Sequence, residues 1–321
     1  MILYIATLIG GFILLVWGAE RFVHGAAACA NNLGISPLII GLTVVGLGTS
    51  APEMLVSAVA AMQDNTGLAI GNAIGSNIAN IGLILGITAL TTPLIVNSSI
   101  IKRELPVLLA ITILGYVLLI DGELGFIDGL ILIATLILFL SWLIISSLQQ
   151  RKTDVIEQEF SEEIPTDMST GRALFWLVIG MIVLLLSSKL LVWAAVEIAT
   201  TLGVSDLIIG LTIIALGTSL PELAASIASA LKNEPDIAIG NIIGSNIFNI
   251  LAVLSIPGLI NPGGFASVVI SRDYPIMLIL TIVLIALSYG YRKNGCITRV
   301  EGALLLFAYG AYQTLLYFNA Q

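Results

Sequence analysis

The chain has 321 residues, of which 58% are hydrophobic and only 10% charged, and its mean hydropathy is +1.08. These values exclude a soluble globular domain, because such domains carry about 25% charged residues. The net charge of −8 gives no indication of a nucleic-acid partner, which would need a basic surface. We therefore expect a protein whose main partner is the lipid bilayer.

Ten apolar stretches follow one another along the chain, each of about the length that crosses a bilayer core as a helix. The predicted spans are 2–19, 35–62, 67–92, 105–120, 126–148, 173–196, 206–231, 236–260, 274–291 and 300–318. The fold class is thus an all-α membrane protein with ten transmembrane helices. A hydrophilic run over 149–172 separates a first five-helix half, 1–148, from a second, 173–321, and we interpret this run as a flexible or partly helical cytoplasmic linker.

The distribution of Lys and Arg predicts the orientation of these spans, because cytoplasmic loops are enriched in both residues. With both termini in the periplasm of an inner-membrane protein, ten of the twelve basic residues lie on the cytoplasmic side. They are Arg21, Lys102, Arg103, Arg151, Lys152, Arg172, Lys232, Arg292, Lys293 and Arg299. The same orientation places Arg272 outside.

An internal repeat joins the two halves. Residues 33–82 match residues 202–251 without a gap at an offset of 169, and 28 of the 50 positions are identical. Matching points lie five predicted spans apart, so the second copy is inverted relative to the first. Inverted repeats of this kind build secondary transporters, whose substrate site lies near the midplane and is formed by interrupted helices. We expect two inverted five-helix repeats with interrupted helices at the midplane.

The letters GTS-PE are identical in the two copies and lie inside predicted spans. In the first copy they are Gly48, Thr49, Ser50, Pro52 and Glu53. Proline lacks an N–H and clashes with the carbonyl four residues earlier, so the helix must kink or open there and free backbone oxygens. The side chains three and four residues before the glutamate share one helical face with it.

The second copy repeats this arrangement at Thr218, Ser219, Pro221 and Glu222. A carboxylate at the bilayer centre costs roughly 2.5 to 3.5 kcal/mol. Because neither motif contains Lys or Arg, we expect a cation from solution to offset that cost.

The letters GN-IGSNI-N are also identical in the two copies. Ser76 and Asn80 share one helical face, and Ser245 and Asn249 repeat them. These oxygens either complete an ion site or form hydrogen bonds between helices. The glycine pairs 71/75 and 240/244 form surfaces of small residues that allow close helix packing.

The combined ligand set consists of carboxylate, amide, hydroxyl and carbonyl oxygens, which hard cations such as Ca²⁺ prefer. Soft metals would favour Cys or His, and neither repeat core contains these residues. No protease pattern or catalytic metal spacing is present, so we expect a transporter without a cofactor and not an enzyme.

These motifs resemble the alpha repeats of the sodium/calcium exchanger superfamily, particularly its bacterial ten-helix members. The resemblance covers essentially the whole chain. It implies exchange of Na⁺ for Ca²⁺ by alternating access, with the first and sixth helices sliding against the other eight.

Carried over motif by motif, the resemblance also assigns ligands. Glu53 and Glu222 would bind both ions, together with the backbone carbonyls of Thr49 and Thr218. The further ligands that it implies are the side chains of Ser50, Ser76, Ser219 and Ser245 and the carbonyls of Gly46 and Ala215.

One departure concerns the residue pair Asn80 and Asn249, because some family members have Asp at the second position. The site then has two acids and not three, which leaves the stoichiometry and the coupling ion open. The alternatives are antiport of Ca²⁺ or another divalent cation such as Mn²⁺ coupled to protons, a passive channel, and an intramembrane enzyme. A monomer is the simplest expectation for the assembly.

Overall fold

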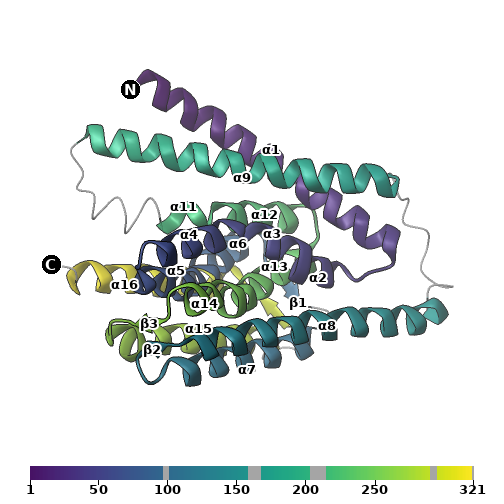
Figure 1. Cartoon of the computed structure of the whole chain (residues 1–321). Coiled ribbons are helices and arrows are strands. Elements are labelled where there is room, and N and C mark those ends of the chain that lie inside the picture. The colour runs from purple at the N-terminus through teal and green to yellow at the C-terminus, as the bar shows by residue number, and fades with distance from the viewer. Residues whose placement is uncertain (97–100, 158–167, 203–214, 290–294, 320–321) are drawn as a thin grey trace.

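The computed structural model describes residues 1–96, 101–157, 168–202, 215–289 and 295–319. The described part is almost entirely helical, as the sequence predicts (Figure 1). Six helical stretches are long and apolar enough to cross a membrane. They are Ile2–Leu33, Thr66–Thr91, Phe126–Ser146, Thr170–Thr201, Pro235–Ile260 and Val269–Tyr289. A bent pair of helices, Pro37–Thr49 and Ala51–Met62, makes a seventh span if it is counted as one.

The described residues of the first half form eight α-helices, with two π-helical turns and two short strands between them. Its α-helices are α1 (Ile2–Leu33), α2 (Pro37–Ile40), α3 (Gly46–Thr49), α4 (Ala51–Met62), α5 (Thr66–Ala79), α6 (Gly86–Thr91), α7 (Ile101–Leu119) and α8 (Phe126–Glu157). The π-helical turns are η1 (Gly41–Val45) and η2 (Asn80–Leu85), and the strands are β1 (Leu94–Val96) and β2 (Glu123–Leu124).

The second half repeats much of this order. Its α-helices are α9 (Thr170–Thr201), α11 (Ala215–Thr218), α12 (Leu220–Leu231), α13 (Pro235–Phe248), α14 (Ser255–Ile260), α15 (Tyr274–Tyr289) and α16 (Arg299–Asn319). The π-helical turns are η5 (Asn249–Val253) and η6 (Val269–Asp273), and the strands are β3 (Gly263–Gly264) and β4 (Gly295–Ile297). Part of the predicted span 206–231 and of the predicted linker 149–172 lies outside the described residues.

Two predicted spans are longer in the structure than their hydropathy indicates. The span predicted over 2–19 continues as α1 to Leu33, and the span predicted over 173–196 extends over Thr170–Thr201 as α9. The first predicted span ends before two charged residues, Glu20 and Arg21. In the structure, the Arg21 guanidinium stacks on the Trp17 and Trp176 rings, at 5.8 and 4.7 Å from their centroids. Such cation–π contacts keep a charged residue inside a helix.

Helices α1 and α9 lie side by side across the top of Figure 1, and α1 also packs on α12. Small residues allow this approach. A Cβ added at Gly18 would lie 2.9 Å from the Leu184 nitrogen, and one at Gly25 or Gly180 would collide with the backbone of the other helix. Glycine contacts of this kind bring membrane helices together.

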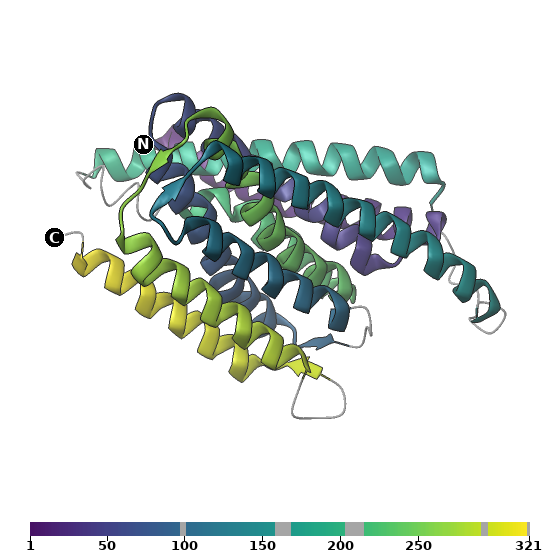
Figure 2. The same ribbon diagram turned by 60° about the horizontal axis from the view of Figure 1, so that its bottom comes forward.

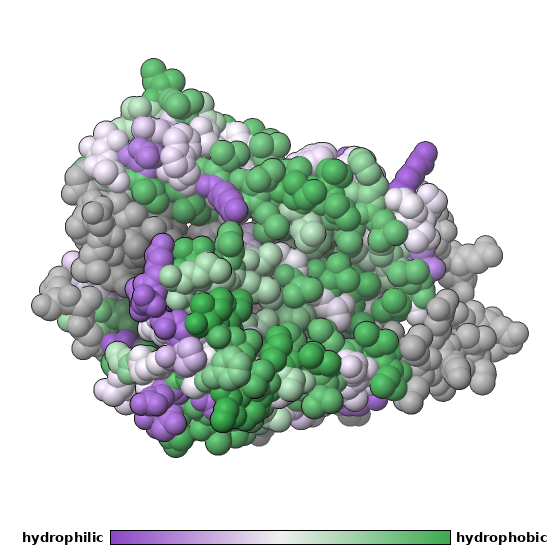
Figure 3. All heavy atoms as spheres, viewed as in Figure 1, coloured by the Kyte–Doolittle hydropathy of each residue, from purple (hydrophilic) through white to green (hydrophobic). Residues whose placement is uncertain are grey.

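The core lies around α5 and α13, which cross inside the remaining helices. The stretch Pro235–Ile260 is buried throughout its most apolar window, whereas only about a fifth of α1 is buried. Apolar side chains dominate the face shown in Figure 3, and many large ones on α1, α8 and α9 are exposed, such as Ile2, Phe12, Leu138 and Phe175. An apolar exterior around a core with polar residues is typical of a membrane protein.

Two small antiparallel sheets fix the ends of the molecule. Strand β1 pairs with β4, with Ile95 opposite Cys296, and β2 pairs with β3, with Leu124 opposite Gly263. Since β1 precedes α7 while β4 follows α15, these two helices run antiparallel, as Figure 2 shows. The start of α7 and the start of α15 therefore lie at opposite ends of the molecule.

Candidate ion-binding site

The first GTS-PE motif interrupts a helix, as its proline predicts. Helix α3 ends at Thr49 and α4 begins at Ala51, and the two parts of the span are bent by 42°. Ser50 occupies the break with φ −79° and ψ 4°. Pro52 is in the first turn of α4, where its missing N–H costs no helical hydrogen bond. Glu53 lies in the same turn, where the positive end of the helix dipole stabilises an anion.

The second motif has nearly the same local geometry. Helix α11 ends at Thr218 and α12 begins at Leu220, with Ser219 between them at φ −89° and ψ 3°. Glu222 lies in the first turn of α12. The two glutamates thus occupy equivalent positions at two helix N-termini.

Both glutamates are buried, with exposed fractions of 1% for Glu53 and 2% for Glu222. Each one contacts hydroxyls from the opposite half. The Ser50 hydroxyl donates a long hydrogen bond of 3.4 Å to Glu222 Oε1, and the Thr218 hydroxyl bonds the Glu53 carboxylate. The carboxylates are also close enough for their negative charges to repel each other. The two predicted acids therefore form one site.

Several oxygens at this site are buried without a hydrogen-bond partner. They are Glu53 Oε2, Glu222 Oε2, Ser219 Oγ and Asn249 Oδ1. Buried carboxylates normally find a partner, since an uncompensated buried charge is strongly destabilising. Neither glutamate forms an ion pair with a basic side chain among the residues that the structure describes. Carboxylate, hydroxyl and amide oxygens of this kind are the ligands that hard cations prefer.

Thr49 joins the two halves through its side chain. Its hydroxyl donates to Asn241 Oδ1 at 3.0 Å and lies 3.4 Å from the Ser245 hydroxyl. A Cβ added at Gly46 would lie 3.1 Å from the Ser245 nitrogen, so α3 packs directly on α13. The structure thus brings Gly46, Thr49 and Ser245 together. Ala215 begins α11, one turn before Thr218.

The two motif asparagines begin matching π-helical turns. Asn80 starts η2 and Asn249 starts η5, and both are buried. Asn249 donates to Asn77 Oδ1 at 3.1 Å, whereas Asn80 Nδ2 has no partner. Single π-helical turns inside α-helices often mark functional sites. Here each turn shifts the end of its motif out of the register of a regular α-helix. No periodicity in the sequence indicates this shift.

A cavity of about 320 Å³ extends from this site along α5 and α16. Its lining includes Asn72, Ser76 and Thr218, and also Asp273, Tyr312 and Gln313. Two predicted ion ligands, Ser76 and Thr218, therefore line a space that a hydrated ion could occupy.

The small-residue surfaces of the two halves differ, although their sequences match. A Cβ added at Gly240 would lie 2.7 Å from the Leu38 carbonyl oxygen, and one at Gly244 would lie 2.5 Å from that of Leu42. The predicted close packing is correct there. For Gly71 and Gly75, which line the cavity, no described atom lies within 4 Å of an added Cβ, and the repeat equivalent of the Leu38–Leu42 segment, 207–211, lies outside the described residues.

The sequence analysis missed a set of asparagines that support the site. Asn72 donates to the Glu53 carbonyl and Asn241 to the Glu222 carbonyl, both at 3.2 Å. Asn77 donates to the Asn246 carbonyl at 3.3 Å. All of these are letters of the repeated GN-IGSNI-N motif, so the repeat itself was the signal that could have identified them.

Within the described part of the chain, no group of three or more His, Cys, Asp or Glu side chains could hold a metal ion. The candidate site therefore depends on two carboxylates and a larger number of neutral oxygens. This charge balances one divalent cation.

Comparison with known proteins agrees with this geometry. The family model described as sodium/calcium exchanger protein matches residues 3–145 and 172–318, which is nearly the whole chain. The chain belongs to the sodium/calcium exchanger family. It is thus an ion antiporter of the membrane, in a family of transporters and not of enzymes.

Similar proteins cover the full length of the chain. It is 50% identical to the putative antiporter CaxA of Alkalimonas amylolytica, over 96% of each protein. It is 41% identical to the inner membrane protein YrbG of Escherichia coli, over 99% of this chain and 98% of that protein. It is 31% identical to the sodium/calcium exchanger MaX1 of Methanosarcina acetivorans, over 96% and 97%.

A solved structure of the sodium-calcium exchanger NCX_Mj, determined without Na⁺ and Ca²⁺, has a TM-score of 0.84 at 34% identity. The match covers 98% of this chain and 99% of that one. The same exchanger soaked with Na⁺ and Ca²⁺ has a TM-score of 0.82. The fold of this family member is therefore that of a structurally characterised exchanger over essentially its whole length.

Proposed function

We propose that this protein is a secondary active antiporter that exchanges Na⁺ for Ca²⁺ across the inner membrane. The observation that carries this proposal is the pair of buried carboxylates, Glu53 and Glu222, each with one unpartnered oxygen and with hydroxyls of the opposite half beside it. Two negative charges balance one Ca²⁺, and the additional hydroxyl and amide oxygens suit Na⁺ ions that compete for overlapping positions.

The ligands in this proposal are the set that the sequence predicts. Glu53 and Glu222 bind both ions, Thr49 and Thr218 contribute backbone carbonyls, and Ser50, Ser76, Ser219 and Ser245 contribute hydroxyls. The carbonyls of Gly46 and Ala215 and the amides of Asn80 and Asn249 complete the set. The unpartnered oxygens of Ser219 and Asn249 support this assignment.

The overall architecture that we propose is ten transmembrane helices in two inverted five-helix halves. The matching breaks at Ser50 and Ser219 and the matching π-helical turns at Asn80 and Asn249 support it. Both termini would face the periplasm, as the distribution of Lys and Arg predicts.

Alternating access gives the two halves opposite roles at any one time. Gly240 and Gly244 pack against η1 and its flanking residues, while Gly71 and Gly75 line a cavity that contacts Ser76 and Thr218. In an inverted repeat each half can take up the environment of the other, because equivalent residues make the contacts in both. The ions would then meet one side of the membrane and afterwards the other.

The relatives are consistent with this reading in their names. MaX1 is named a sodium/calcium exchanger, YrbG an inner membrane protein, and the solved NCX_Mj structures describe extracellular ion exchange and occlusion of its binding site. CaxA is named only as a putative antiporter, so the coupling ion needs a direct test.

The test uses purified protein in vesicles loaded with Na⁺ and diluted into Na⁺-free medium that contains labelled Ca²⁺. We expect uptake of Ca²⁺ that requires internal Na⁺ and stops when internal K⁺ replaces it. Uptake that follows a pH gradient instead would make the protein a proton-coupled antiporter. Uptake that needs no counter-ion would make it a channel.

A further inference from the structure

A second repeated motif lies outside the matched segments 33–82 and 202–251. At the same offset of 169, residues 101–106 read IKRELP and residues 270–275 read ISRDYP. Each copy therefore has an arginine, an acid and a proline in the same order. The acids are Glu104 in the first half and Asp273 in the second. Neither acid belongs to the candidate site, although both are buried.

The two acids lie at opposite ends of the molecule. Glu104 is in the first turn of α7, which follows β1, and β1 pairs with β4. Asp273 ends η6, which follows β3, and β3 pairs with β2 at the far end of α7. The length of α7 separates the two sheets, so one acid is close to each face of the membrane.

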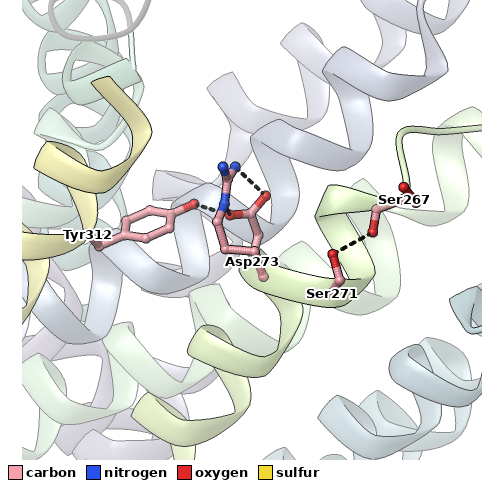
Figure 4. A network of polar contacts seen from close by, with 5 residues as sticks. Ser267, Ser271, Asp273 and Tyr312 are labelled. Atoms are coloured by element: carbon pink, nitrogen blue, oxygen red, sulfur yellow. Dashed lines mark hydrogen bonds and ion pairs between the residues drawn. The ribbon is translucent and has the colours of Figure 1, made fainter. Parts of the chain in front are cut away.

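Asp273 lines the cavity that contacts the candidate site. The same cavity contacts Ser76 and Thr218, and Asn72 beside them bonds the Glu53 carbonyl. Figure 4 shows Tyr312 of α16 directed at the Asp273 carboxylate, to which it donates a hydrogen bond of 3.0 Å. An ion in this cavity can therefore contact both the Asp273 carboxylate and residues of the candidate site.

Asp273 also has a cationic partner of its own. Arg272 Nε lies 2.7 Å from Oδ1 and Nη2 lies 3.1 Å from Oδ2, which is a bidentate pair. A lone carboxylate in a narrow, poorly solvated passage would hold a divalent cation tightly and slow its release. The attached guanidinium competes with the passing ion for the same oxygens, so an ion can bind there and leave again.

Glu104 is the counterpart of Asp273 in a closed environment. It is 2% exposed, and its Oε2 has no hydrogen-bond partner. Around the segment of this half that contains η1, Gly240 and Gly244 of the second half pack closely. Glu104 thus has a buried carboxylate oxygen without a partner, whereas its counterpart Asp273 lines a cavity.

We propose that Asp273 and Glu104 are two cation-relay sites, one on each side of the membrane, through which ions pass between solution and the Glu53/Glu222 site. Asp273 serves the side to which the present cavity leads, and Glu104 serves the opposite side after the halves exchange their arrangements. This inference rests on the proposed antiport function and adds the path that the ions take.

A purely structural role for this motif would give a different result. If the Arg272–Asp273 pair only anchors α16 to η6, its loss affects stability and therefore transport from both sides alike. A relay site affects the apparent affinity for Ca²⁺ on one side alone, because the other side does not use it.

The experiment compares oriented membrane vesicles, right-side-out and inside-out, that contain the full-length protein. For Asp273→Asn we expect the half-saturating Ca²⁺ concentration to rise about tenfold on one face, as for loss of a charge that concentrates ions in a passage, and to stay unchanged on the other face. Glu104→Gln should give the same change on the opposite face. Arg272→Gln, which removes the competitor and leaves the acid, should lower the half-saturating concentration on the face that Asp273 serves.

The matched control is Glu123→Gln, which removes an exposed acid of β2 that does not line the cavity. It should leave both faces unchanged. Equal effects of Asp273→Asn on the two faces, no effect, or the same face for both acids would each overturn the proposal. Failure of the sodium assignment is distinguishable, because wild-type uptake would then need another driving gradient while the one-sided effects could still be measured under that gradient.

Discussion

The two halves of this protein have the same motif letters but different surroundings. In the second half, Gly240 and Gly244 pack so closely on the backbone around Leu38 and Leu42 that an added Cβ would collide. In the first half, Gly71 and Gly75 line a cavity, with open space for a Cβ as far as the described atoms extend. Among the described residues, the same motif letters thus have different neighbours in the two halves. If the two halves exchange arrangements during transport, the sequence of each half must be compatible with both the packed and the cavity-lining arrangement.

The largest expected effect is that of the two acids, Glu53 and Glu222. Loss of either acid should reduce Ca²⁺ uptake equally. Glu53→Gln and Glu222→Gln each remove one of two charges that balance Ca²⁺, so we expect each to reduce Ca²⁺ uptake by vesicles to the level of empty vesicles. Ser57→Ala, which removes a buried hydroxyl bonded to the Val253 carbonyl, is a control that should retain uptake. Normal Ca²⁺ uptake by either glutamate variant would contradict the equivalence of the two halves.

The glycines should separate the halves. Gly244→Ala places a methyl group 2.5 Å from the Leu42 carbonyl oxygen, and overpacking of this kind costs about 1 to 3 kcal/mol. Gly75→Ala meets no atom of the described residues within 4 Å, so we expect a change within about 0.5 kcal/mol. Unfolding midpoints of the purified proteins in detergent measure this difference.

Transport measurements test the same comparison between Gly75 and Gly244. If Gly75 must pack closely in the other arrangement, Gly75→Ala should slow Ca²⁺ uptake although it leaves the unfolding midpoint unchanged. Wild-type uptake by Gly75→Ala would show that this surface stays open throughout the cycle.

The asparagines should give a smaller difference between the halves. Asn241 contacts the Thr49 hydroxyl, the Ser226 hydroxyl at 2.9 Å and the Glu222 carbonyl. Asn241→Ala removes hydrogen bonds to all three of these buried groups, each worth about 1 kcal/mol. Asn72→Ala removes the bond to the Glu53 carbonyl, worth about 1 kcal/mol.

A double-mutant cycle checks the contact across the halves. Thr49→Val and Asn241→Ala should destabilise by less together than the sum of the two single changes, because they remove one shared hydrogen bond. Additive effects would show that the contact between Thr49 and Asn241 contributes nothing to stability.

Local sequence rules predicted the backbone breaks at the candidate site. Proline within an apolar span predicted the helix breaks, and the structure places Ser50 and Ser219 at those breaks with the same backbone conformation. The spacing of three and four residues assumed a continuous helix, whereas in the structure the helix breaks at Ser50 and the Ser50 hydroxyl bonds Glu222 of the other half. The family model and the solved relatives confirm the family that the repeated motifs indicate.

Features that depend on packing could not be predicted in this way. Hydropathy ended α1 at its charged residues, since it does not account for the stacking of Arg21 on two tryptophans. The π-helical turns at Asn80 and Asn249 follow no sequence period. The difference between Gly75 and Gly244 arises from the arrangement of the halves, about which two identical motifs carry no information.

The central claim is that Ca²⁺ and Na⁺ share one site between Glu53 and Glu222. Equilibrium titration of the purified protein with Ca²⁺ in detergent, at constant ionic strength in Na⁺ or in K⁺, tests it most directly. We predict that Na⁺ weakens Ca²⁺ binding in proportion to its concentration and that Glu53→Gln and Glu222→Gln each abolish the binding. Ca²⁺ binding that is equally tight in Na⁺ and K⁺, or that survives in either variant, would contradict the account.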